Sequence, residues 1–404
     1  MMRKWDIRAL AIAAAIIAGP ALAQSKYDAG ATDNEIKIGN IMPYSGPLSA
    51  YALIGRTIGA YLKKVNAEGG VNGRTITFLS YDDGFSPPKT VEQARKLVES
   101  DEVLFIFQSL GTPTNLAIRS YMNTKKVPQL FVATGATTFG DVSRFPWTMG
   151  WQPTYQTEAR IYAKYLRQNY PNGRIAVLYQ NDDSGKDYLK GLKEGLGGAV
   201  PIVGEAPYDV QEPTVESQVV TLRASGADIF FNEASPKFAA QAIRKAAELN
   251  WRPMQLLASI SASVGSVLKP AGVENATGIL TAGYLKDPTD PAWRDDPAVG
   301  EWRAFMGKYL PDGDQTSTFG VYGYLTAQTM IQVLKQCGDD LTRANVMKEA
   351  AKLKNMRLEM LMPGITLDTG PDDYYPIKRM QMIRFNGESL EAFGPVLGGE
   401  LLGK

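Results

Sequence analysis

The sequence predicts an α/β protein built from two doubly wound, Rossmann-like lobes that are joined by a multi-stranded hinge. Two observations carry this prediction. From Asp33 onward, short β-rich segments alternate with helical patterns, which is typical of βαβ units and parallel sheets. The same alternation then starts a second time at about residue 155. A chain of 404 residues, 44% of them hydrophobic, has enough apolar material for two cores.

The first series of elements fills the segment up to about residue 150. Its first predicted helix, 52–68, places Ile54, Ile58, Leu62 and Val65 on one face and stops at Gly69-Gly70. Further helices are expected at 88–99 and 115–125, and strands at 35–42, 75–81, 103–107 and 129–132.

The second series repeats the alternation of strands and helices. We expect helices at 155–168, 186–196, 215–225 and 237–249, and strands at 174–179, 201–206, 227–232 and 255–258. The remainder, with helices near 299–309, 321–336 and 343–353 and strands near Ile365 and Met380, is too fragmentary for a third domain. We therefore expect an N-terminal lobe of 33–153 plus about 285–375, and a C-terminal lobe of 154–284 plus about 376–404. Several chain crossings between the lobes would form the hinge.

The first 23 residues have the pattern of a secretory signal peptide. Basic residues come first, an apolar run from Leu10 to Ala18 follows, and Ala21-Leu22-Ala23 has the small-x-small form of a cleavage site. The run is too short to span a bilayer, and no later segment approaches 20 uninterrupted apolar residues. No Cys follows the cleavage site, which argues against a lipid anchor. We therefore expect a free periplasmic protein.

Composition excludes several functions. Histidine is absent and Cys337 is the only cysteine, so Ser-His-Asp and Cys-His catalysis, the commonest zinc sites and intrachain disulfides are ruled out. The formal net charge of +1 offers no general attraction for nucleic acid. We expect neither a cofactor nor a metal.

Paired acids at Asp82-Asp83 and Asp182-Asp183 follow strands directly, and turn or capping roles explain them better than acid/base catalysis. No Walker A or GxGxxG pattern follows any strand. The sequence therefore does not indicate an enzyme, and a secreted hydrolase is the weakest alternative.

Small polar residues gather in the loops that follow the strands of the first lobe. These loops are 43–51, 108–112 and 133–137, and in open α/β sheets ligands bind beyond the carboxyl ends of strands, at helix N-termini. Hydroxyl groups, backbone amides and helix dipoles together suit a carboxylate. Each Ser or Thr alone is more simply an N-cap, but three such loops on one lobe favour a binding site.

These loops resemble the type I periplasmic solute-binding proteins, specifically the branched-chain amino acid receptors of ABC transporters. The resemblance runs from about residue 34 to 395 and is most specific in the combination of two motifs. The motifs that carry it are Met42-Pro43-Tyr44-Ser45-Gly46-Pro47 with Tyr51, Asn66-Ala67-Glu68-Gly69-Gly70-Val71-Asn72-Gly73, Ser109-Leu110-Gly111-Thr112, Ala133-Thr134-Gly135-Ala136-Thr137 and Tyr179-Gln180-Asn181-Asp182-Asp183-Ser184-Gly185.

The resemblance implies a ligand held between the lobes. Matching the motifs places Ser109 or Leu110, Gly135 and Thr137 around the ligand's carboxylate, with Tyr51 beside it. In the second lobe, Ser184 and Ala234 stand where the family often has tyrosines. The loop 259–263 stands where the family has an acid for the ligand's ammonium group, and it contains no carboxylate.

This departure matters because burying an ammonium ion without a counter-charge costs several kcal/mol. Glu233 either replaces the missing acid or is a solvated rim residue. We therefore expect a carboxylate ligand with an aromatic or aliphatic body, and amino acids come second. The expected ligand-binding residues are Tyr44, Ser45, Tyr51, Ser109, Leu110, Gly111, Thr112, Gly135, Ala136, Thr137, Tyr155, Asn181, Ser184, Glu233, Ala234, Ser259, Ile260 and Ser261.

The expected partner is the permease of an ABC importer in the inner membrane, and the expected oligomeric state is a monomer. A clamp of this kind can also report ligand occupancy to a membrane receptor. The sequence does not separate delivery from signalling.

Overall fold

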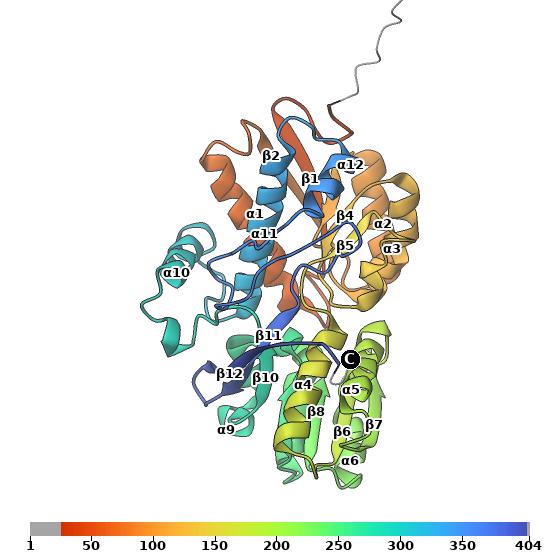
Figure 1. The fold of residues 1–404 in the computed structure, drawn as a ribbon, viewed down its shortest axis with the longest axis vertical. Coiled ribbons are helices and arrows are strands. Elements are labelled where there is room, and N and C mark those ends of the chain that lie inside the picture. The colour runs from red at the N-terminus through yellow and green to blue at the C-terminus, as the bar shows by residue number, and fades with distance from the viewer. Residues whose placement is uncertain (1–25, 402–404) are drawn as a thin grey trace, which may run out of the picture.

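A computed structural model describes residues 26–401, so the expected signal peptide at 1–23 lies outside the described residues. Figure 1 shows two lobes stacked along the long axis, the first in the upper half and the second in the lower half. None of the helices in residues 26–401 is both long enough and apolar enough to cross a membrane.

The first lobe is built on a five-stranded sheet with the order β2-β1-β3-β4-β5. All of its strand pairs are parallel. Its strands are β1 (Glu35–Met42), β2 (Thr75–Asp82), β3 (Phe105–Phe107), β4 (Gln129–Val132) and β5 (Thr148–Gly150). The central strands β3 and β4 are buried along their whole length, as expected for a parallel sheet covered on both faces.

Helices from both ends of the chain cover this sheet. They are α1 (Ala52–Ala67), α2 (Pro87–Arg95), α3 (Thr112–Lys125), α10 (Pro297–Tyr309), α11 (Thr318–Cys337) and α12 (Arg343–Ala350). In Figure 1, α11 lies along α1 although more than 250 residues separate them in sequence. Gly323 permits this approach, because a Cβ atom there would lie 2.7 Å from the backbone oxygen of Ile54.

The second lobe is built on a seven-stranded sheet with the order β12-β11-β10-β9-β8-β6-β7. Strands β6 to β10 pair in parallel, whereas β11 runs antiparallel to β10 and to β12. The strands are β6 (Ile175–Gln180), β7 (Ile202–Tyr208), β8 (Ile229–Glu233), β9 (Met254–Leu257), β10 (Leu280–Gly283), β11 (Arg379–Phe385) and β12 (Leu390–Gly398). Its helices are α4 (Tyr155–Asn169), α5 (Asp183–Leu196), α6 (Glu216–Ala224), α7 (Pro236–Glu248), α8 (Lys269–Ala271) and α9 (Val273–Ala276).

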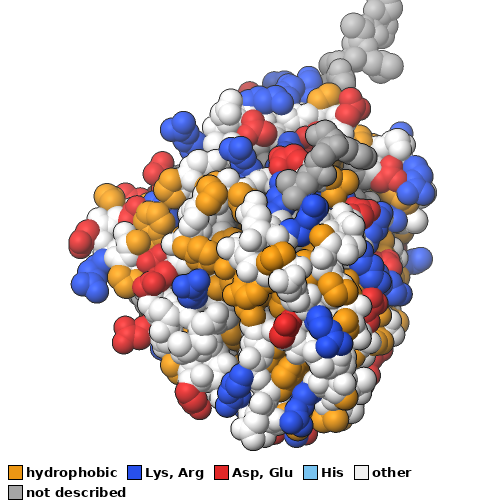
Figure 2. Space-filling view, turned by 60° about the horizontal axis from the view of Figure 1, so that its bottom comes forward, with side chains coloured by type: hydrophobic (Ala, Val, Ile, Leu, Met, Phe, Trp, Pro, Cys, Tyr) orange, Lys and Arg blue, Asp and Glu red, His pale blue; other side chains and the backbone are white. Residues whose placement is uncertain are grey.

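The chain passes between the two lobes between β5 and α4, between β10 and α10, and between α12 and β11. Short helices complete the connections: η1 (Ser49–Tyr51), η2 (Lys96–Ser100), η3 (Thr137–Gly140), η4 (Ser259–Ser261), η5 (Val264–Leu268) and η6 (Pro291–Trp293). On the face in Figure 2, positive and negative side chains are intermixed, with apolar side chains gathered near the middle.

The predicted α/β architecture with two parallel-sheet lobes is confirmed, and several local predictions are wrong. The segment around Ile365 is not a strand, since it contributes only an isolated bridge between Met356 and Leu367. Strands β5, β10 and β12 were not predicted: β5 and β10 are short, and β12 contains Gly394 and Pro395, which are rare inside strands.

Helices α3, α5 and α11 begin three residues earlier than predicted, and two of these starts have a clear local cause. Helix α5 starts at Asp183 because the Asp182 carboxylate accepts hydrogen bonds from the Ser184 and Gly185 amides and caps the helix. Helix α3 starts at Thr112, directly after Gly111, whose φ of 103° only glycine adopts readily.

Candidate functional site

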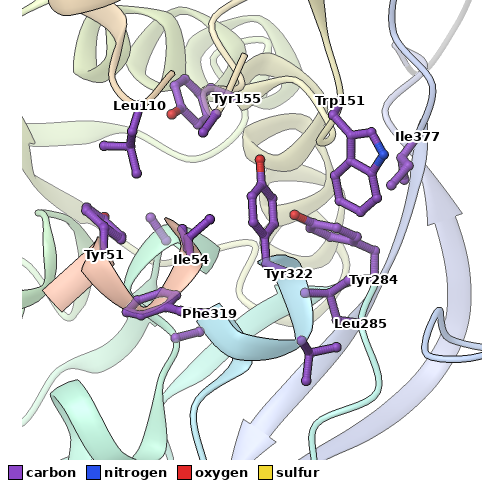
Figure 3. Packing of buried hydrophobic residues seen from close by; sticks show 14 of the residues in the cluster. Tyr51, Ile54, Leu110, Trp151, Tyr155, Tyr284, Leu285, Phe319, Tyr322 and Ile377 are labelled. Carbon is purple, nitrogen blue, oxygen red and sulfur yellow. The ribbon is translucent and has the colours of Figure 1, made fainter. Parts of the chain in front are cut away.

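A cavity lies between the lobes, where the carboxyl ends of both sheets face each other. The space free of protein atoms is about 990 Å³, including the solvent at its mouth. Figure 3 shows Tyr51, Leu110, Tyr155 and Tyr322 around this space, on elements of both lobes. The full lining consists of Leu48, Tyr51, Ile54, Phe85, Leu110, Gly111, Thr112, Ala133, Gln152, Tyr155, Gln180, Ser184, Ser235, Ser259, Ile260, Ala262, Thr281, Ala282, Gly283, Tyr284, Leu285, Asp287, Thr318, Phe319, Tyr322, Ile383 and Leu390.

The long helices that reach the cavity do so with their N-terminal ends. Thr112, Tyr155 and Thr318 are the first residues of α3, α4 and α11, while Ser184 is the second residue of α5 and Ser235 is the N-cap of α7. A helix N-terminus carries partial positive charge and unpaired backbone amides. The cavity is therefore electrostatically suited to an anion, although the described residues bring no Lys or Arg into its lining.

A chain of hydroxyl groups crosses this region. The Thr134 hydroxyl donates to the Tyr155 hydroxyl oxygen at 3.2 Å, and Thr112 and Thr134 hydroxyls lie 2.7 Å apart. Each threonine has one hydroxyl hydrogen, so Thr112 donates to Thr134 and Thr134 donates to Tyr155. No protein acceptor within residues 26–401 takes the hydrogen of Tyr155 itself. Tyr155 lines the cavity, and its hydroxyl is free to donate to a ligand.

Tyr155 is held in place from two sides. Its ring stacks on Tyr188 with 4.4 Å between centroids, and its backbone amide donates to Gly135 O at 2.8 Å. A Cβ atom at Gly135 would lie 2.7 Å from the Tyr155 ring, so glycine is required there. Burial raises the pKa of Tyr155 far above its ordinary value, which keeps the hydroxyl protonated as a donor.

A buried acid one turn after Tyr155 on α4 fixes the position of Ser259. Glu158, 2% exposed, accepts hydrogen bonds from the Ser259 amide at 2.7 Å and the Ser259 hydroxyl at 2.6 Å. The hydroxyls of Tyr162 and Tyr188 donate to the same carboxyl group at 2.8 and 2.9 Å. Burial raises the pKa of Glu158, and these hydrogen bonds oppose the rise. The group holds Ser259 at the cavity rather than facing the ligand itself.

The lobes are closed on one another. The Tyr51 hydroxyl of the first lobe donates to Ile260 O of the second at 3.0 Å, and Thr318 donates to Ala262 O at 3.0 Å. On the other side, Thr137 donates to Asp187 on α5. These bonds join the lobes around the cavity.

Asp287 is the only Asp or Glu among the residues of the described chain that line the cavity. It is 1% exposed, and its Oδ1 accepts from the Thr289 amide at 2.7 Å. Its Oδ2 has no hydrogen-bond partner. Burial raises the pKa of Asp287 to about 7.

The structure brings part of the expected residue set to the cavity and leaves the rest outside it. The expected residues that line the cavity are Tyr51, Leu110, Gly111, Thr112, Tyr155, Ser184, Ser259 and Ile260. The others are Tyr44, Ser45, Ser109, Gly135, Ala136, Thr137, Asn181, Glu233, Ala234 and Ser261.

The first-lobe residues outside the lining bond within the protein. Tyr44 and Ser45 donate to the Asp82 carboxylate through their amides at 2.9 and 3.1 Å. Ser109 bonds Asn115, and Thr137 bonds Asp187. These hydrogen bonds thus stabilise the loops and the contact between the two closed lobes.

The second-lobe residues outside the lining have structural positions as well. Glu233 is 1% exposed beneath the strand ends, where its Oε2 accepts from the Gln180 amide at 2.8 Å and its Oε1 has no partner. It is therefore not a solvated rim residue. Ser261 donates to Ala234 O at 2.6 Å, and Asn181 is exposed.

Sequence reasoning missed the residues contributed by the late elements, above all Asp287, Thr318, Phe319, Tyr322 and Ile383. Thr318 and Phe319 open the long, largely buried helix α11 directly after its N-cap Ser317, and this N-cap was a readable signal of a helix start. Asp287 and Ile383 follow or lie in strands of the crossing segments, where no loop motif marks them.

The chain belongs to the periplasmic binding protein family, whose model matches residues 35–389. It is thus a periplasmic binding protein. Members of this family are binding proteins and not enzymes.

Among curated relatives, the chain is similar to the Leu/Ile/Val-binding protein homolog 2 of Brucella abortus (strain 2308). The two are 23% identical over 340 residues, covering 81% of this chain and 86% of the relative.

Two solved structures have the same fold. One is a branched chain amino acid ABC transporter protein from Thermus thermophilus with bound valine, with a TM-score of 0.82 and 14% identity, covering 90% of this chain and 97% of the other. Another is a solute binding protein of an ABC transporter from Rhodopseudomonas palustris BisB5 in complex with 3,4-dihydroxy benzoic acid, with a TM-score of 0.75 and 21% identity, covering 90% and 98%.

Proposed function

We propose that this protein captures a small carboxylic acid with an aromatic or aliphatic body and delivers it to the permease of an ABC importer. The observation that carries the proposal is the cavity itself. Helix N-termini converge on a space lined mainly by apolar and aromatic side chains, and its polar groups are neutral hydroxyls and amides apart from Asp287.

The carboxylate belongs at the first turns of α3 and α5. Thr112 and Ser184 lie there, and the Tyr155 hydroxyl has a hydrogen without an acceptor. Hydrogen bonds to a charged acceptor are about twice as strong as neutral ones, and the low dielectric of a closed cavity strengthens them. The apolar body then lies against side chains such as Leu48, Ile54 and Phe319.

An amino acid is the second candidate. The Thermus thermophilus protein of the same fold holds valine, whereas the Rhodopseudomonas palustris protein holds 3,4-dihydroxy benzoic acid. An α-ammonium group adjacent to the carboxylate needs acceptors next to Tyr155 and Ser184. Glu158 is occupied by Ser259 and two tyrosines, and Glu233 does not line the cavity. Among the described residues, no acid is thus available next to Tyr155 and Ser184, which favours a simple carboxylate.

In this account the protein works in the periplasm after removal of residues 1–23 and acts as a monomer without a catalytic step. The closed arrangement of the lobes is the form that a permease recognises, because paired docking surfaces come together only on closure. The alternative partner is a membrane receptor, to which the protein would report the same closure.

A thermal-shift screen tests the ligand class. A ligand that binds only the folded state raises Tm, by an amount that grows with concentration. Benzoate, 3-phenylpropanoate, hexanoate and octanoate are compared with leucine, isoleucine and valine. We expect one or more of the simple acids to raise Tm and the amino acids to leave it unchanged. A response to the amino acids alone would reverse the assignment.

A further inference from the structure

The cavity floor is an edge of the second sheet. Four strands contribute to it. Gln180 ends β6 and Ser184 follows it, while Ser235 follows β8. Ser259 and Ile260 follow β9, and Asp287 follows β10. These strands are adjacent in the order β10-β9-β8-β6 and run parallel, so their carboxyl ends share one edge.

This strand order places Ser184 and Asp287 at opposite ends of the cavity floor. Three strand spacings of about 4.8 Å lie between β6 and β10, which is about 14 Å along the edge. Ser184 lies at one end of this row and Asp287 at the other. Between them lie Ser235 and Ser259, whose hydroxyls are bonded to Tyr208 and Glu158, and the apolar side chains of Ile260 and Ala262.

One carboxylate oxygen of Asp287 has no hydrogen-bond partner among the described residues. The Asp287 Oδ1 accepts from the amide and the hydroxyl of Thr289, whereas Oδ2 has no partner although the residue is only 1% exposed. An unpaired buried acceptor costs free energy unless a ligand or a water satisfies it. Lys286, the adjacent cation, bonds Asp296 at 2.7 Å and is therefore engaged elsewhere.

We propose that Asp287 is a specificity residue that accepts a hydrogen bond from a hydroxyl group at the distal end of the ligand. The ligand class is then a hydroxylated acid, in which a carboxylate and a hydroxyl stand at opposite ends of an apolar body. This inference rests on the proposed function, because it takes the carboxylate at the Ser184 end as given.

A hydroxyl fits this position better than an ammonium group. A hydroxyl has one hydrogen to donate, which matches the single orphan oxygen, whereas an ammonium group has three.

Isothermal titration with two matched series of acids tests the proposal. The first series is 3-phenylpropanoate, its 4-hydroxyphenyl analogue and its 4-methoxyphenyl analogue. The second is octanoate, 8-hydroxyoctanoate and 8-aminooctanoate. In the series that binds, we expect the hydroxylated acid to bind about tenfold tighter than its parent, as one additional buried hydrogen bond allows. The methoxy analogue, which has lost the donor, should lose this advantage.

Protein variants complete the test. Asp287→Asn keeps an oxygen for Thr289 but presents an amide group in place of the orphan acceptor, so the preference for the hydroxylated acid should fall to about twofold or less. Asp368→Asn is the control, because the Asp368 oxygens are bonded by Asn355 and Thr366 and the residue does not line the cavity. It should retain the wild-type preference.

The outcomes are distinguishable. Binding of the parent acids with no preference for a hydroxyl, an unchanged preference in Asp287→Asn, or tighter binding of 8-aminooctanoate than of 8-hydroxyoctanoate overturns the role of Asp287 and leaves the carboxylate site standing. Failure of both series to bind, with Tm raised by leucine or valine instead, overturns the proposed function and this inference together.

Discussion

The Thr137 hydroxyl of the first lobe donates a hydrogen bond of 2.7 Å to Asp187 on α5 of the second lobe, and the Thr137 amide donates to the same carboxylate at 2.9 Å. The Gln156 side chain adds a third donor at 2.6 Å. A residue that family resemblance places around the ligand's carboxylate is thus paired with a carboxylate of the protein itself. The pair joins the lobes in the closed form, so it contributes to closure.

Replacing this acid should weaken ligand binding without unfolding either lobe. Asp187→Ala removes the acceptor of both Thr137 bonds, and hydrogen bonds to charged groups contribute about 1.5–3 kcal/mol each. We expect the Kd of the bound acid to rise about tenfold or more in isothermal titration. Glu194→Gln is the control, because Glu194 pairs with Arg160 inside the second lobe. An unchanged Kd in Asp187→Ala would remove the pair from the closure mechanism.

The free hydroxyl of Tyr155 gives a second prediction. Tyr155→Phe keeps the ring that stacks on Tyr188 but removes the donor at the proposed carboxylate position. Loss of one charge-assisted hydrogen bond should raise Kd about 10- to 100-fold. Tyr179→Phe, outside the cavity lining, should bind as the wild type does. Equal affinities for both variants would place the carboxylate elsewhere.

The close packing of Gly135 against the Tyr155 ring gives a third prediction. In Gly135→Ala the new Cβ would lie 2.6 Å from Pro153 O and 2.7 Å from the Tyr155 ring, so one of them must move. Overpacking of this kind costs about 1–3 kcal/mol. We expect lower Tm and weaker acid binding. Gly150→Ala should change neither, since the nearest atom to its new Cβ, Tyr374 O, is 4.0 Å away. Similar behaviour of the two variants would argue against the tight contact.

Glu233 predicts a pH dependence of stability. Burial raises the pKa of Glu233 well above its ordinary value of 4.5, because the buried carboxylate is costly to ionise. The folded state then binds more protons than the unfolded state, so this group's contribution is most favourable below about pH 4.5 and declines as pH rises through the raised pKa. Glu233→Gln removes the ionisable group. In urea unfolding, its stability relative to wild type should increase from pH 5 to pH 8; a constant difference would contradict this.

The sequence predicts the repeated elements and the returning helices well, and several short or irregular strands poorly. Strand β1 and its following helix were predicted to within a residue, because alternation and a helical apolar face are local signals. Strand β10 was not predicted because it is short and pairs with β11, which lies far along the chain. Strand β12 follows β11 closely, but it contains Gly394 and Pro395, which are rare inside strands.

The residues of the candidate site also fall into a group that the sequence predicts and a group that it does not. Tyr51, Thr112 and Ser184 lie in short helical turns or helix N-termini that follow strands, and the loop pattern together with the family resemblance brought them into the expected set. Asp287 and Tyr322 reach the cavity only because the chain crosses back between the lobes, and a sequence does not show where a crossing segment will pass. Thr137 was expected at the ligand, yet its partner Asp187 is 50 residues away on the other lobe.

The most direct measurement is a crystal structure of the protein with the acid that raises Tm most. The account predicts closed lobes, the ligand carboxylate within hydrogen-bond distance of the Tyr155 hydroxyl and the first turns of α3 and α5, and the apolar body between Ile54 and Phe319. A ligand carboxylate bound away from Tyr155, or an ammonium group seated at that position, would contradict it.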